Sequence, residues 1–312
     1  MNSEPLPSPP RAMLVASSNR RRGAEVFSER LAVGLSEHGW VVDLISLTGT
    51  RESARARIEP ITDMAPSSAS GFKRRIAGAL RHRIRDFDPD VLVANGGATL
   101  RYCVVSTLRT STPILYIAIG EPIYWIRSWM SKTLNRLLLR RVRLIVAVSQ
   151  QTADQLSQLE PHVRDRIEVV VPGVSAVDCQ GLGEEHEGPL RLLQIGSLSR
   201  EKDPAMAISA IEQLPDVLLR FVGSGPLRED LVGRVRAAGL VDRVEFVGAV
   251  DDVTPHLVWA DALLLTSRTE GLPGVILEAA AVAVPTVAVD VGGVSEAVVS
   301  GLTGVVVERE TR

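Results

Sequence analysis

One late stretch decides the fold: Ser267-Arg-Thr-Glu-Gly-Leu-Pro-Gly-Val-Ile-Leu-Glu278. The apolar run at 262–265 predicts a buried strand before it. Glu270-Gly271 predicts a turn, and Pro273 fits the first turn of a helix that continues to Ala283. A helix that begins at a glycine-flanked turn offers free backbone N–H groups and the positive end of its dipole. The stretch therefore predicts a strand–turn–helix unit that suits an anionic ligand.

Two carboxylates mark this unit, Glu270 at the turn and Glu278 inside the helix. The intervening residues, at helical rise, separate them by about 12 Å. A glycoside hydrolase needs its two carboxyl groups within about 5 to 9.5 Å. The pair is therefore too far apart for one glycosidic bond, but it suits the two ends of an extended ligand with phosphates between them. The alternative is an ordinary strand–turn–helix with one exposed and one capping glutamate.

Length and composition predict a two-domain protein of the cytoplasm. The 312 residues are enough for two domains, and 45% hydrophobic with 23% charged residues is typical of soluble globular proteins. No apolar run reaches the roughly 18 residues of a membrane span. Residues 1–10 are rich in Pro and Ser without an apolar signal core, which predicts a disordered leader. Cys103 and Cys179 lie far apart without metal-ligand spacing, so we expect reduced thiols.

The net charge of −2 hides an asymmetry between the two halves. Residues 1–172 hold 24 Lys/Arg and 16 Asp/Glu, whereas residues 173–312 hold 11 and 21. A basic half and an acidic half suggest separate roles and an attractive pairing between them.

The first half, residues 11–172, predicts an α/β domain. Helical patterns at 24–38 and 97–108 lie between continuous apolar runs, which argues for a parallel sheet covered on both faces. A dinucleotide fingerprint would need Gly-x-Gly-x-x-Gly after the first strand, but only Gly23 is present, so a nicotinamide dehydrogenase is disfavoured. The arginines next to it, including Arg22, suit either an anionic group or a solvated loop. The predicted strands are 13–17, 41–47, 91–95, 114–119 and 144–149.

Two further segments of this half carry candidate functions. Glu121 and Tyr124 follow a strand, at the edge where open α/β sheets bind ligands. Residues 127–143 then combine tryptophans and leucines with six basic residues and no acid, which suits either an anionic membrane surface or a solvated surface helix. Nucleic acid is a weaker option, since aromatic residues are 4% of the chain. The basic residues are Arg127, Lys132, Arg136, Arg140, Arg141 and Arg143.

The second half repeats the strand–helix alternation. Residues 173–189 contain a run rich in Gly and Glu, which predicts a linker, and residues 190–312 predict a second domain. Glycines follow the strands where helices begin, a geometry that suits phosphate. Pro204 opens one of these helices. The predicted strands are 190–195, 218–222, 244–248, 262–265, 286–289 and 304–308.

With these motifs in order, the chain resembles the retaining, nucleotide-sugar-dependent glycosyltransferases of family 4, which have the GT-B fold of two Rossmann-like domains. The most specific match is Glu270-x7-Glu278. In the first half, Arg22-Gly-Ala-Glu25 is similar to the glycine-rich acceptor-side loop of the family. Supporting matches are Gly196…Glu201-Lys202-Asp203, Val222-Gly-Ser-Gly-Pro226, Val244-Glu-Phe-Val-Gly248 and Gly292-Gly293…Glu296.

The resemblance implies a role for each site residue. Glu270 would bind hydroxyls of the donor sugar and Glu278 those of the ribose, while Lys202 and the backbone after Glu270 would bind the diphosphate as it gains charge. The leaving phosphate would deprotonate the acceptor, and no metal or other cofactor is expected. Acceptor-side candidates are Arg22, Gly23 and Tyr124, with Glu121 as a catalytic candidate. The donor-binding set is Gly196, Ser197, Lys202, Gly223, Gly225, Val250, Glu270, Gly271, Leu272, Pro273, Gly274, Val275 and Glu278.

Three departures from the family pattern keep alternatives open. Ser197 stands where relatives usually have arginine, Gly120-Glu121-Pro122 replaces a frequent histidine region, and the sequence stops at Arg312, before the closing helices of relatives. We therefore expect an exposed apolar patch beside the last strand. The sequence therefore predicts a cytoplasmic transferase with a lipid-linked or saccharide acceptor. If the basic segment binds lipid, the protein is expected to be peripheral on the inner membrane face. The alternatives are a non-catalytic nucleotide-sugar-binding module and a nucleotide-sugar epimerase of the same architecture.

Overall fold

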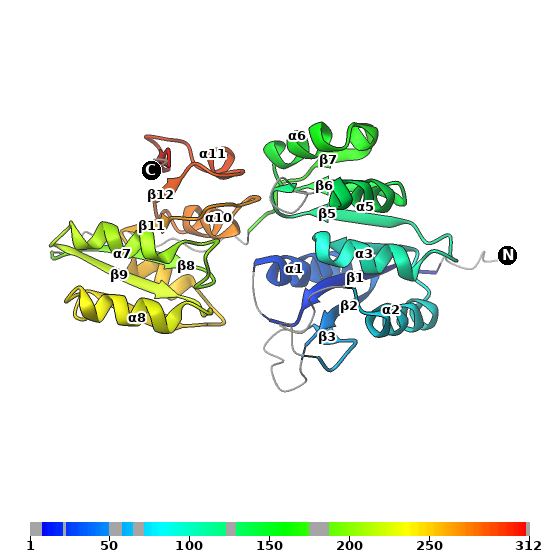
Figure 1. The fold of residues 1–312 in the computed structure, drawn as a ribbon, viewed down its shortest axis with the longest axis horizontal. Coiled ribbons are helices and arrows are strands. Elements are labelled where there is room, and N and C mark those ends of the chain that lie inside the picture. The colour runs from blue at the N-terminus through cyan, green and yellow to red at the C-terminus, as the bar shows by residue number, and fades with distance from the viewer. Residues whose placement is uncertain are drawn as a thin grey trace, which may run out of the picture. The chain divides into compact units, whose positions relative to one another are not determined.

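The structure, a computed structural model, describes residues 8–20, 23–49, 58–64, 72–122, 129–174 and 187–309. It contains two compact units, each built on one sheet whose strand pairs are all parallel (Figure 1). The first unit comprises Met1–Val148 and Thr152–Val170, and the second comprises Ser149–Gln151 and Val171–Arg312. The predicted linker lies mostly outside the described residues.

The sheet of the first unit has seven strands in the order β3-β2-β1-β4-β5-β6-β7. The strand order reverses between β1 and β4, and in open α/β sheets ligands bind at the carboxyl ends of the strands at such a point. The strands are β1 Arg11–Ser18, β2 Val41–Thr48, β3 Glu59–Pro60, β4 Val91–Asn95, β5 Ile114–Ala118, β6 Val142–Ala147 and β7 Ile167–Val169.

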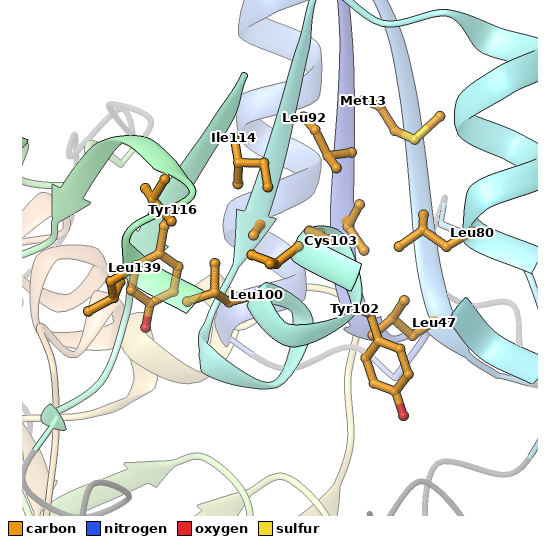
Figure 2. Packing of buried hydrophobic residues seen from close by; sticks show 14 of the residues in the cluster. Met13, Leu47, Leu80, Leu92, Leu100, Tyr102, Cys103, Ile114, Tyr116 and Leu139 are labelled. Carbon is orange, nitrogen blue, oxygen red and sulfur yellow. The ribbon is translucent and has the colours of Figure 1, made fainter. Parts of the chain in front are cut away.

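Helices of the first unit pack their apolar sides on this sheet. Figure 2 shows Leu80 and Cys103, from α2 and α3, beside Met13, Leu92 and Ile114 from the strands. Burial raises the pKa of the Cys103 thiol, so this cysteine stays protonated, in line with the expected reduced thiol. The helices are α1 Gly23–Glu37, α2 Arg74–Phe87, α3 Gly97–Ser106, α5 Trp129–Leu139 and α6 Gln150–Leu159, followed by the 3-10 helix Pro161–Arg166.

The sheet of the second unit has six strands in the order β10-β9-β8-β11-β12-β13. Leu192 packs in one core cluster and its neighbour Leu193 in another, which means that both faces of the sheet are covered. The strands are β8 Leu190–Ile195, β9 Val217–Val222, β10 Val244–Gly248, β11 Ala262–Leu265, β12 Thr286–Val289 and β13 Gly304–Val307. The helices are α7 Pro204–Glu212, α8 Arg228–Ala237, α9 Thr254–Trp259, α10 Gly274–Ala281 and α11 Val294–Ala297.

Three predicted helices are shorter than expected, and one of them, α3, ends at Ser106 instead of residue 108. The helix after Glu270 was expected to reach Ala283, but α10 ends at Ala281, because Ala283 has a left-handed conformation with φ of 58° and Pro285 follows closely. Pro273 precedes the helix as its N-cap. The basic segment at 127–143 is not one helix either, since α5 ends at Leu139 and β6 begins at Val142.

Apolar side chains are exposed at β13 and the turn before it. Two of them, Val305 and Val307, lie on the strand itself, with exposed fractions of 47% and 41%. The expected apolar patch beside the last strand stays a prediction. Across the described ranges, the longest apolar helical stretch falls short of what a membrane crossing requires. The exposed apolar residues of the turn before β13 are Val299 and Leu302.

Candidate functional site

The predicted site of the second unit is carried by two loops. The Lys202 loop, residues 196–203, connects β8 to α7, and the Glu270 loop, residues 266–273, connects β11 to α10. β8 and β11 are paired neighbours in a parallel sheet. Both loops therefore begin side by side at the carboxyl ends of these strands. Residues 60 to 70 positions apart in the sequence are thereby brought into contact.

The two predicted catalytic residues of these loops touch directly. Lys202 Nζ lies 2.5 Å from Glu270 Oε1, and the buried Ser267 hydroxyl donates to the same oxygen at 2.6 Å. The Glu270 side chain is 9% exposed and that of Lys202 26%. A carboxylate and an ammonium group thus lie together at the strand ends, where one can accept hydrogen bonds from hydroxyls and the other can bind an anion.

Hydrogen bonds to main-chain carbonyl groups connect the two loops. The Arg268 N–H donates to the Glu201 carbonyl at 2.7 Å. The Thr266 hydroxyl contacts the carbonyl oxygens of Lys202 and Asp203 at 3.0 and 2.9 Å. Gln194 Nε2, from β8, donates to the Lys202 carbonyl at 3.1 Å. The backbone under Lys202 is therefore fixed by groups from two neighbouring strands.

Glycines permit the close stacking of the next loop. A Cβ atom at Gly223 would collide with the Gly196 carbonyl, and one at Gly225 would collide with the backbone of Leu198. Gly223 also has a φ of 141°, a conformation that L side chains rarely adopt. These predicted donor-binding glycines are thus required for the approach of two backbones. Val250, after β10, packs partly buried on the apolar core of this unit.

The Glu270 loop leads into the amino end of α10. No side chain caps this helix at Pro273, and the Ile276 N–H donates to the Pro273 carbonyl at 3.0 Å. Phosphate binding at this helix start stays a prediction. The Gly293 N–H donates to the Gly271 carbonyl at 2.6 Å and fixes the start of the turn. Glu278 lies half-buried within α10. The other predicted members, Ser197, Leu272, Gly274 and Val275, lie on these same two loops and the first turn of α10.

In the first unit, a buried polar cluster lies where β1 and β4 end. The Ser17 and Ser18 hydroxyls donate to Glu25 Oε1 at 2.9 and 3.2 Å. Asn95 Nδ2 donates to Ser28 Oγ at 2.5 Å. Glu25, 2% exposed, belongs to α1, so the sequence-based description of residues 22–25 as a loop is corrected from Gly23 onward.

Sequence reasoning missed most of this cluster, although polar residues ending buried strands were a usable signal. Glu121, 7% exposed, follows β5 in the same unit. Two acceptor-side candidates, Arg22 and Tyr124, lie outside the described residues.

The basic segment is partly engaged in structural contacts. Arg136 Nε lies 3.2 Å from Oε2 of Glu160, a fully buried carboxylate, and Arg141 donates to the Thr107 and Thr110 carbonyls. Lys132 and Arg140 are exposed. Among the described residues, no group of three or more His, Cys, Asp or Glu side chains is placed to hold a metal ion. Metal independence stays a prediction.

Two family models match almost the whole sequence. The model described as Glycosyltransferase Family 4 matches residues 21–177. The model described as Glycosyl transferases group 1 matches residues 183–312. The chain belongs to glycosyltransferase family 4. The resemblance drawn from the glutamate and glycine motifs is thereby confirmed.

Curated relatives of this family 4 chain include enzymes of several pathways. It is 30% identical to a glycogen synthase of Mycobacterium tuberculosis over 195 residues, which cover 60% of the chain and 45% of that enzyme. It is 30% identical to the 2-deoxystreptamine N-acetyl-D-glucosaminyltransferase of Streptomyces fradiae over 192 residues, covering 56% and 46%. The chain thus spans about half the length of these relatives.

Solved structures confirm the predicted GT-B fold of the family 4 chain. Anabaena HepE, solved in complex with UDP and glucose, superposes with a TM-score of 0.77 at 20% identity, covering 95% of this chain and 85% of that one. Sucrose-phosphate synthase from Thermosynechococcus elongatus gives a TM-score of 0.78 at 18% identity, covering 96% and 86%. At these identities the likeness shows the fold alone.

Proposed function

We propose that the chain transfers a sugar from a nucleotide-sugar donor to an acceptor hydroxyl, with retention of anomeric configuration and without a metal ion. The observation that carries the proposal is the contact of Lys202 with Glu270. It lies at the carboxyl ends of β8 and β11, in the loops that lead to α7 and α10. These groups supply a cation and a hydroxyl acceptor beside a helix start that no side chain caps. A nucleotide sugar presents the complementary groups, a diphosphate and a sugar with several hydroxyls.

Each group of the loop pair has a distinct role in this proposal. Glu270 accepts hydrogen bonds from the donor sugar, and Glu278 from the ribose. Lys202 and the first N–H groups of α10 bind the diphosphate, whose charge grows as the glycosidic bond breaks, so these contacts lower the barrier. The acceptor hydroxyl transfers its proton to the phosphate oxygen whose bond to the sugar breaks. The nucleotide is therefore released with that proton.

The donor class is supported by structural neighbours and the acceptor class is open between two chemistries. HepE has been solved with UDP-glucose, which makes uridine nucleotides the first probes for this chain. A matched relative in Campylobacter jejuni acts on an undecaprenol-linked glycan, whereas the Streptomyces relative acts on 2-deoxystreptamine. A lipid-linked or a saccharide acceptor is accordingly proposed for the first unit, in the cytoplasm, with membrane contact through exposed Lys132 and Arg140 in the lipid-linked case.

Nucleotide release tests the proposal. The parent chain, mixed with UDP-glucose or UDP-N-acetylglucosamine and candidate acceptors, should release UDP and form a glycosylated product, and Lys202→Ala should lose this activity. Binding without release would establish a non-catalytic module. An epimerised nucleotide sugar, without net UDP release and without a glycosylated acceptor, would establish an epimerase.

A further inference from the structure

Arg309, which lies outside every motif quoted above, follows β13 by two residues and reaches both loops of the site. Its Nη1 donates to Asp203 Oδ2 at 2.9 Å. Its Nη2 donates to the carbonyl of Thr266 at 2.7 Å and contacts that of Ser267 at 3.3 Å. One guanidinium thus joins the residue after Lys202 to the residues that begin the Glu270 loop.

Asp203 is held in an unfavourable backbone conformation at this junction. Its φ is 44°, in the left-handed region that a non-glycine residue keeps only when its surroundings hold it there. It occupies the N-cap of α7 but makes no side-chain cap hydrogen bond. Its carboxylate accepts instead from Arg309 and from Arg268 Nη2, both at 2.9 Å. The helix-capping group has therefore been diverted to bind arginine.

Of the two arginines on Asp203, Arg309 is the better placed to fix it. The Arg309 side chain is 28% exposed and that of Arg268 59%, so water and salt screen the Arg268 pair more strongly. The planar guanidinium of Arg309 also donates to both loops at once, to a carboxylate on one loop and to carbonyl groups on the other. A lysine ammonium, a single point of charge, does not reproduce this geometry.

We propose that Arg309 is a positioning residue of the donor site, an inference that rests on the proposed function. It acts through the Asp203 carboxylate and the Thr266 and Ser267 carbonyls. By tying these together, it sets the spacing at which Lys202 and Glu270 meet a nucleotide sugar. Losing Arg309 should loosen the loop pair and weaken ligand binding, without any direct contact between Arg309 and the ligand being lost.

Arg309→Leu and Arg309→Lys test the proposal, with Arg243→Leu as the matched control. Arg243 likewise ties carbonyl groups of the second unit, since its Nη1 donates to the Leu214 oxygen at 2.5 Å and to those of Ile211 and Pro215 at 3.2 Å. Two measurements are made on the full chain: amide hydrogen exchange at Arg268, and calorimetric affinity for UDP, GDP and ADP. Arg309→Lys keeps the charge and guards against a leucine variant that fails to fold.

We expect both Arg309 variants to exchange the Arg268 amide at least tenfold faster and to bind the preferred diphosphate about tenfold more weakly. Arg243→Leu should change neither quantity. Faster exchange with unchanged affinity would show a merely structural arginine and overturn the proposal, as would unchanged exchange in both variants. If the parent chain binds none of the three diphosphates, the proposed function fails first and this inference falls with it; if the parent binds and all variants bind equally, this inference alone falls.

Discussion

Replacing Glu270 with alanine should move the affinities for a nucleotide and for its nucleotide sugar in opposite directions. Lys202 Nζ lies 2.5 Å from Glu270 Oε1, so a diphosphate that binds this ammonium competes with the carboxylate for it. A partly exposed ion pair contributes about 1 kcal/mol. Removing the competing carboxylate should therefore raise the affinity for UDP about fivefold.

The nucleotide sugar also loses a partner in this variant. A hydrogen bond from a sugar hydroxyl to a carboxylate contributes about 1.5 to 3 kcal/mol. Set against the gain of about 1 kcal/mol from the freed lysine, the net loss is about 0.5 to 2 kcal/mol, or two- to thirtyfold in affinity for UDP-glucose. The ratio of the two affinities is thus the sensitive quantity.

Calorimetry with UDP and UDP-glucose at one pH and salt concentration measures that ratio. Ser267→Ala is the control, because it removes the 2.6 Å hydroxyl bond to Glu270 but keeps the carboxylate beside Lys202. It should leave UDP affinity unchanged. Equal weakening of both ligands by Glu270→Ala would refute the assignment of Glu270 to the sugar. If UDP binding weakens and UDP-glucose binding does not weaken by the same factor, Glu270 orients Lys202 instead of competing for it.

Four other predictions have defined outcomes. Glu278→Ala should weaken UDP binding by about 1.5 to 3 kcal/mol per ribose hydrogen bond, and unchanged calorimetric affinity would remove it from the site. Lys202→Ala should lower kcat more than it raises KM, whereas a raised KM at constant kcat would limit the lysine to binding. Gly223→Ala should destabilise by about 1 to 3 kcal/mol, measured as the denaturant midpoint, while Gly233→Ala on exposed α8 should not destabilise. Neutralising Lys132 and Arg140 should weaken binding to anionic vesicles by about 1 kcal/mol each, and a parent that does not bind vesicles ends the membrane proposal.

Most strands could be predicted from the sequence because parallel strands covered on both faces are continuous apolar runs. β8, β10, β11 and β12 have the predicted bounds. The short edge strands β3 and β7, of two and three residues, carry too few positions for any periodic pattern. The helix α2 was not named, although Ile76, Leu80 and Ile84 recur at helical spacing along it.

The sequence named members of the candidate site but not the contacts between them. Sequence motifs place Lys202 and Glu270 after strands, yet only the order β8-β11 makes those strands neighbours. The contact of Asn95 with Ser28 needed the pairing of β1 with β4 in the same way. Arg309 carried no signal, since its contacts depend on where the chain turns after β13. Local patterns identify groups, whereas strand order decides which groups meet.

The fixed backbone under Lys202 has a kinetic consequence. Its carbonyl is held by Thr266 and Gln194, and its N–H by Ser199, so the ammonium group changes partners only by rotation about its side-chain bonds. Rotamer changes of partly exposed side chains take picoseconds to nanoseconds, whereas loop closure takes microseconds or longer. If Lys202 binds a diphosphate, we therefore expect it to reach this ligand by a side-chain rotation, without closure of its own loop.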